Sequence, residues 1–222
     1  MGQWWVHSAW YDGGPVLLGS WIIWVLGAIT LHELAHGWAA LWEGDTTPRD
    51  LGHMSANPVV HMGTFSLVLF AMVGIAFGAM PVRPERFRHG HVGEAIVAAA
   101  GPAMNLLLAF VTLTAAGVID GMLQGAKPEP MVANILLFLT IGGWLNLVLA
   151  ALNLLPITPL DGSRILAAFV PGARRLFSSP NAPIIGMGVL LAIFMSGIAS
   201  VGLNALTMLA AHWRGLIAGL IG

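Results

Sequence analysis

The chain has 222 residues, of which 57% are hydrophobic and only 9% are charged, and its formal net charge is −1. A soluble domain carries about 25% charged residues, so this composition excludes an ordinary soluble protein and indicates an integral membrane protein. The near-neutral charge argues against a nucleic-acid partner, and the absence of cysteine excludes disulfides, iron–sulfur clusters and thiolate zinc sites.

The first apolar run, residues 16–42, is long enough to cross a bilayer as a helix. Inside it stands an ionisable motif, His32-Glu33-Leu34-Ala35-His36. Charged groups within a span cost on the order of 2.5–3.5 kcal/mol each, so the motif requires compensation. Residues four apart share one helix face, which allows His32 and His36 to bind one cation while Glu33 acts on a nearby water. The alternative is a pair of histidines that contact neighbouring helices without a metal.

A polar connector, residues 43–64, follows this run and contains His53 and His61. Histidines in loops are usually solvated, so neither is assigned a role. The next apolar run, residues 65–80, is short and interrupted by glycines, and we expect it to enter the membrane and return. Short membrane-associated β-strands are a further option between the first and second full spans.

The second full span is expected at residues 95–119 and the third at residues 131–155. The second contains Gly101-Pro102-Ala103-Met104-Asn105, whose small residues permit close helix packing. Asn105 is an amide in an apolar span and needs a partner. It serves either as a polar contact between helices or as part of a site.

The third span ends in a proline-containing run, residues 153–162, which includes Asp161. Pro156 and Pro159 break the helix and free backbone groups, which a membrane protein tolerates only against a cavity or other protein. Asp161 with the two histidines completes three protein ligands and leaves a fourth position for water, as in catalytic zinc sites. If Asp161 is not a ligand, His61 is the first alternative.

Parity constrains the topology. For His36 and Asp161 to meet at one depth, the spans that carry them must run in the same direction, so an odd number of crossings separates them. Two apolar runs lie between these spans, residues 65–80 and residues 95–119, so one of them does not cross. We expect it to be the shorter run, residues 65–80. With this assignment most arginines lie on one side, the positive-inside pattern, and the site lies nearer the cytoplasm.

The last part of the chain is expected to hold a surface segment at residues 163–180, a fourth full span at residues 184–203, and an interfacial or partly inserted helix to the end. The predicted fold class is thus an all-α membrane protein, a polytopic helical bundle with about four full spans plus one re-entrant segment. We expect one domain, residues 1–222, with a catalytic core at about 16–170 and a C-terminal part at about 184–222.

The motifs at residues 32–36, 100–105 and 153–162 resemble, in this order, those of the site-2 protease family of intramembrane zinc metalloproteases. The connector is similar to that of the compact bacterial and archaeal branch, whereas Thr158 stands where many relatives have proline. The resemblance implies one catalytic Zn²⁺ and the following residues: His32, His36 and Asp161 as metal ligands, Glu33 as general base, and Asn153 and Pro156 as substrate-positioning residues, with Asn105 as a further candidate.

The resemblance implies hydrolysis of a peptide bond within or near a transmembrane helix of a membrane-protein substrate, which releases a signalling or regulatory fragment. The expected location is the bacterial or archaeal cell membrane, and the expected partners are the substrate and the lipid bilayer. A metal-ion transporter or metal-binding protein that uses the same His/Asp site is the alternative, but it would not need Glu33. An inactive relative that only binds is disfavoured by the intact Glu33. Substrate identity and oligomeric state stay open.

Overall fold

The computed structural model describes residues 4–222, and all regular secondary structure in that range is helical. The elements in chain order are α1 (Trp5–Glu43), α2 (Thr47–Asp50), α3 (Pro58–Val73), the 3₁₀ turn η1 (Pro84–Arg86), α4 (His91–Leu123), α5 (Pro130–Asn153), α6 (Asp161–Phe169), α7 (Pro171–Phe177), α8 (Ala182–Met195) and α9 (Ile198–Ile221). The optional β-strands between the first two full spans are therefore not found among residues 4–222.

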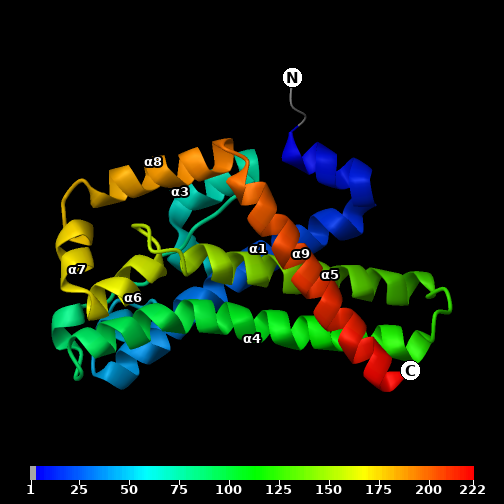
Figure 1. Cartoon of the computed structure of the whole chain (residues 1–222), viewed down its shortest axis with the longest axis horizontal. Helices are drawn as coiled ribbons and strands as arrows, with labels where there is room; N and C mark the ends of the chain where they lie inside the picture. The colour runs from blue at the N-terminus through cyan, green and yellow to red at the C-terminus, as the bar shows by residue number, and fades with distance from the viewer. Residues whose placement is uncertain (1–3) are drawn as a thin grey trace.

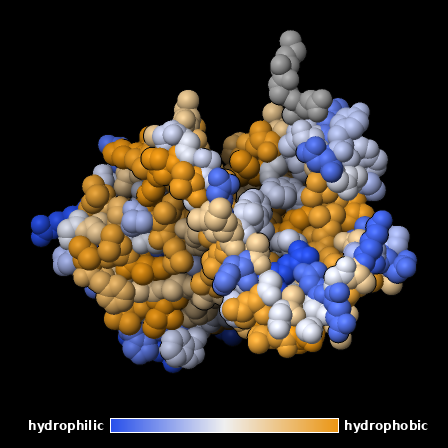
Figure 2. All heavy atoms as spheres, turned by 45° about the vertical axis from the view of Figure 1, so that its right-hand side comes forward, coloured by the Kyte–Doolittle hydropathy of each residue, from blue (hydrophilic) through white to orange (hydrophobic). Residues whose placement is uncertain are grey.

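Three of these helices, α1, α4 and α5, are long and apolar enough to cross a membrane, and the bent pair α7–α8 brings the number of candidates to four if it counts as one span. In Figure 1, α4 and α5 lie side by side along the long axis, and α1 runs in the same direction as α5. Figure 2 shows hydrophobic side chains over broad areas of one face, with hydrophilic groups in separate patches. The molecule is an all-helical membrane protein.

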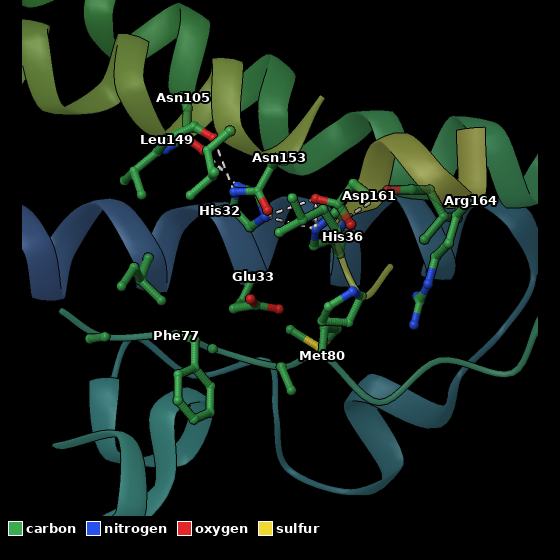
Figure 3. A pocket seen from close by; sticks show the side chains of 18 of the residues that line it. His32, Glu33, His36, Phe77, Met80, Asn105, Leu149, Asn153, Asp161 and Arg164 are labelled. Carbon is green, nitrogen blue, oxygen red and sulfur yellow. Dashed lines mark hydrogen bonds and ion pairs between the residues drawn. The ribbon is translucent and has the colours of Figure 1, made fainter. Parts of the chain in front are cut away.

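The helix α3 and the segment after it form a hairpin. Residues 75–83, called the strap below, belong to no helix or strand; they run as a drawn-out segment past Phe77 and Met80 (Figure 3) and bond back to α3. The Ser66 hydroxyl accepts from the Phe77 N–H and donates to the Phe77 carbonyl, at 2.8 and 2.6 Å, and the Ala79 N–H donates to the His61 carbonyl at 3.0 Å. Because these contacts engage a side chain and a helix carbonyl, no strand ladder forms. The α3 helix has 16 residues, too few for a typical span.

Indole groups of the N-terminal region hold the tip of this hairpin. Trp4 and Trp5 both donate their indole N–H to the Ala71 carbonyl, at 3.0 and 3.1 Å, and Trp21 donates to the Gly74 carbonyl at 3.3 Å. The last carbonyls of a helix have no partner within the helix, and in lipid no water replaces one. The tryptophans therefore supply donors to carbonyls at the end of α3, as the re-entrant placement expected from the sequence would require.

The other end of the strap is fixed by a buried carboxylate. Asp45 has no exposed surface, and its two oxygens accept from the Thr47 N–H at 3.0 Å and from the Arg83 N–H at 2.7 Å. Burial acts to raise the pKa of the Asp45 carboxyl, but these hydrogen bonds and the nearby Arg86 outweigh it and hold the pKa below its ordinary value. The strap is thus tied to α3 at two places and to the end of α1 at a third.

The C-terminal region is divided differently from the expected span at residues 184–203. The α8 helix ends at Met195, and Gly197 takes a left-handed conformation with φ of 79° before α9 begins. The α9 helix then crosses α5 and α4 diagonally and ends beside the α4–α5 loop (Figure 1). It is held there by an ion pair between Arg214 and Asp120.

Candidate metal centre

The α1 helix carries three of the predicted site residues at the depth where it is most buried. His32, Glu33 and His36 are 6–7% exposed. Figure 3 shows the two histidines directed toward α4 and α6, whereas Glu33 leaves the helix on another side, toward the strap. This division follows from the helical repeat, which places positions i and i+4 together and position i+1 about a quarter turn away.

Asp161 reaches the histidines because the chain folds back after α5. The α5 helix ends at Asn153 and α6 begins at Asp161. A Cβ atom on Gly162 would overlap the carbonyls of Leu154 and Leu155, so this close return requires glycine. Asp161 Oδ2 consequently lies 3.2 Å from His32 Nε2 and 3.3 Å from His36 Nε2.

The two Nε2 atoms are 3.0 Å apart, and one ligand atom from each of the three residues lies within 4.8 Å of the others. Among residues 4–222 this is the one group of three His, Asp or Glu side chains with such spacing. Two imidazoles and one carboxylate are a donor set that suits zinc. The structure thus brings together the three residues that the sequence predicts as ligands.

The far side of each imidazole is also engaged. His36 Nδ1 lies 2.7 Å from the Val97 carbonyl, and His32 Nδ1 lies 2.6 Å from Asn105 Oδ1. A backbone carbonyl only accepts, so His36 Nδ1 carries the proton and its Nε2 lone pair faces Asp161. Ligating histidines in metal sites are held in this way by a carbonyl or carboxylate behind them.

Two further observations test whether a metal fits. Within residues 4–222, Asp161 Oδ2 is buried and receives no well-aligned hydrogen bond, as expected of an oxygen that binds a cation. A Cβ atom on Gly101 would lie 2.5 Å from His32 Nε2 and closer still to His36 Nε2. The missing side chain therefore leaves space beside the ligand atoms, and the residues fit a single zinc ion.

Glu33 and the ligands line a cleft of about 470 Å³. The strap forms one wall, and a Cβ atom on Gly78 would come within 2.7 Å of Glu33 Cγ, so the backbone of the strap lies directly against the glutamate. Asn153, Pro159 and Arg164 line the same cleft, and α8 adds Met187 and Leu190. Asn153 also donates to the Leu149 carbonyl of its own helix at 3.0 Å.

Not every residue singled out in the sequence lines the cleft. Pro156 is exposed and does not line it. His61 is buried, with its Nε2 2.6 Å from the Ser55 carbonyl, and it fixes the strap through its own carbonyl. From the sequence, Gly101 was expected only to permit close helix packing, and no motif pointed to the carbonyl of Val97, because neither carries a side-chain group that could bind a metal.

The α8 helix contacts the α5–α6 turn close to its own start. A Cβ atom on Gly186 would overlap the Thr158 carbonyl, and the Thr158 hydroxyl donates to the Ala182 carbonyl at 2.6 Å. Apart from this point, α8 packs chiefly against α7 and α9. Thr158 thus supplies the hydroxyl that holds the start of α8.

Comparison with known proteins also points to a zinc metalloprotease. The profile of Peptidase family M50 matches residues 114–197, which include Asn153 and Asp161. Over 184 residues the chain is 33% identical to the "Putative zinc metalloprotease YwhC" of Bacillus subtilis, and the alignment covers 81% of each chain. The chain belongs to peptidase family M50. The family predicted from the three motifs is confirmed.

Two other relatives of this M50 protein are also named "putative zinc metalloproteases". The chain is 28% identical over 152 residues to Rip2 of Mycolicibacterium smegmatis, covering 66% of this chain and 54% of Rip2. It is 33% identical over 147 residues to sll0528 of Synechocystis, covering 66% of this chain and 32% of sll0528. These two relatives are therefore much longer than the part they share with the M50 chain. No solved structure matches the chain significantly.

Proposed function

We propose that this chain is an intramembrane zinc metalloprotease that hydrolyses a peptide bond within or near a transmembrane helix of a membrane-protein substrate. One observation carries the proposal. The group formed by His32, His36 and Asp161 is buried in an apolar helical bundle, and Glu33 lies beside it in the same cleft. Membership in family M50 supports it.

Peptide hydrolysis at this site would need a zinc ion and the Glu33 carboxylate. Zinc with three protein ligands keeps a fourth position for water and lowers the pKa of that water toward about 7. The Glu33 carboxylate lines the cleft beside the three residues that would hold the zinc. It can accept a proton from the attacking water and pass the proton to the leaving amine, the task of a general base and then a general acid.

The strap supports an extended substrate. Its backbone runs along the cleft beside Glu33, and the anchors that hold it use the N–H groups of Phe77, Ala79 and Arg83. Residues 76–80 of the strap line the cleft, and so does Val82. An unwound stretch of the substrate can lie beside such a segment, because extended chains pair through their backbone groups. A helical substrate would therefore have to unwind locally before cleavage.

The proposal includes topology and location. The helices α1 and α5 run in the same direction (Figure 1). In the proposed topology both cross the membrane, whereas the hairpin of α3 and the strap enters it and returns. The arginine-rich ends lie on the cytoplasmic side by the positive-inside rule, so the site lies nearer the cytoplasm of a bacterial or archaeal cell. A metal transporter with the same ligands is the weaker alternative, because transport gives no use to Glu33 beside a wall of extended backbone.

The test is cleavage and zinc content of Glu33→Gln. The variant keeps all three ligands but loses the base, so zinc content should stay at the wild-type level while cleavage of a model transmembrane substrate falls by about 10²–10⁴-fold. Glu85→Gln, at an exposed glutamate of η1, is the matched control and should cleave normally. Asp161→Ala should lose both zinc and cleavage. Undiminished cleavage by Glu33→Gln would overturn the proposed mechanism.

A further inference from the structure

Two buried amides connect His32 of α1 to the backbone of α5. Asn105 of α4 and Asn146 of α5 have no exposed surface. Asn105 Oδ1 lies 2.6 Å from His32 Nδ1, Asn105 Nδ2 lies 2.8 Å from Asn146 Oδ1, and Asn146 Nδ2 lies 2.8 Å from the carbonyl of Gly142. The chain of contacts thus passes through three helices and ends on a backbone carbonyl.

The Gly142 carbonyl, at the end of this series of contacts, determines the direction of every hydrogen bond in the series. The Gly142 carbonyl only accepts, so Asn146 must turn its NH₂ group toward it and its oxygen toward Asn105. Asn105 must then donate to Asn146 and present its own oxygen to His32. That oxygen only accepts, so the proton of a neutral His32 is on Nδ1. The lone pair of Nε2 is therefore directed at Asp161 and the metal position.

Neither amide can be turned over without losing its hydrogen bonds. Turning over either one would place two oxygens or two NH₂ groups face to face inside the bundle, where no solvent competes. A Cβ atom at position 142 would overlap the Trp24 ring, so α1 and α5 approach closely at Gly142, where the series of hydrogen bonds ends. His36 differs from His32, because the backbone carbonyl of Val97 holds it without any side chain.

We propose that Asn105 and Asn146 are positioning residues that fix His32 in its metal-binding tautomer and orientation. Zinc affinity then depends on Asn146, a side chain that is two hydrogen bonds away from the ligand. The proposal rests on the proposed function only in taking His32, His36 and Asp161 to bind zinc. It assigns Asn105 to orienting a ligand, in place of the substrate-positioning role that the sequence suggested.

The test measures zinc affinity of the purified protein by competition with a chelator, without any substrate. Asn105→Leu and Asn146→Leu should each weaken zinc binding about 10–100-fold, the usual effect of removing a group that holds a ligand. Because the two amides act in series, the double variant should bind zinc no more weakly than Asn105→Leu alone. Asn204→Leu, at an exposed asparagine of α9, is the control and should bind zinc as wild type does.

A fourth variant separates orientation from packing. Asn105→Asp keeps an acceptor for His32 but loses the NH₂ group that Asn146 needs, so it should keep zinc affinity within a few-fold of wild type although thermal stability falls. If Asn105→Asp loses zinc as severely as Asn105→Leu, or if Asn146→Leu binds zinc normally, the inference is wrong. If the wild-type protein itself binds no zinc, the proposed function fails instead.

Discussion

At the scale of the residue, the space for the metal depends on a position without a side chain. A methyl group on Gly101 would lie against the Nε2 atoms of both His32 and His36. Gly101→Ala should therefore reduce zinc content to near background even though all three ligands remain. Metal analysis of the purified variant checks this, and Gly27→Ala, where an added Cβ meets nothing within 4 Å, should keep its zinc. Full zinc content in Gly101→Ala would show that the metal lies elsewhere.

The ligands could be predicted from the sequence, but the groups that hold them could not. The spacing of His32 and His36 follows from the helical repeat alone, and Asp161 stood out as a carboxylate beside a broken span. The contact between His32 and Asn105 joins residues 73 positions apart. It depends on how α1 and α4 pack, which no local pattern encodes. Asn146 lies in the middle of the third expected span, and the sequence assigned it no role.

At the scale of the element, the strap is held over Glu33 by Asp45. Asp45→Asn turns an NH₂ group toward one of its two backbone donors, the N–H groups of Thr47 and Arg83, and leaves that donor unpaired, at a cost of about 1–3 kcal/mol. We expect a lower melting temperature and slower cleavage with unchanged zinc content. Asp50→Asn, at an exposed position of α2, is the control. Wild-type melting and cleavage in Asp45→Asn would show that this anchor does not matter.

The same carboxylate gives a pH dependence with a defined sign. The pKa of Asp45 is lower in the folded protein than its ordinary value of 3.8. Its stabilising effect is therefore complete above about pH 4 and is lost as the pH falls through the lowered pKa. The difference in melting temperature between wild type and Asp45→Asn should shrink over that acidic range. A difference that stays constant into strong acid would contradict the assignment.

The element scale also shows where sequence patterns fail. The short length of residues 65–80 and the parity of the spans predicted a returning segment, and the hairpin has that shape. The optional strands are not found, because the strap bonds to Ser66, His61 and Asp45 instead of to a second extended segment. The division of the last apolar run depends on the left-handed Gly197. In a chain with 28 glycines, no pattern marks that one as a break.

At the scale of the whole molecule, the topology can be tested with single cysteines, since the chain has none of its own. Loop glycines are poor sites, because Gly44, Gly90 and Gly125 all have positive φ and a side chain there is strained. Exposed neighbours are better: Leu51, Glu85 and Ala126. An impermeant thiol reagent should label Ala126→Cys on intact cells, and the other two only after the membrane is opened. Labelling of Glu85→Cys on intact cells would mean that the α3 hairpin crosses the membrane.

The attachment of α8 separates access to the cleft from the geometry of the site. Met187 and Leu190 cover part of the cleft, and their helix is joined to the α5–α6 turn where Gly186 and Ala182 meet Thr158. A bend of 94° precedes α8 and the left-handed Gly197 follows it. Local opening requires least free energy where few packed contacts are lost. For the transmembrane substrate that we propose, swinging α8 outward would open a way into the cleft while α1, α4 and α5 keep His32, His36 and their supports in place.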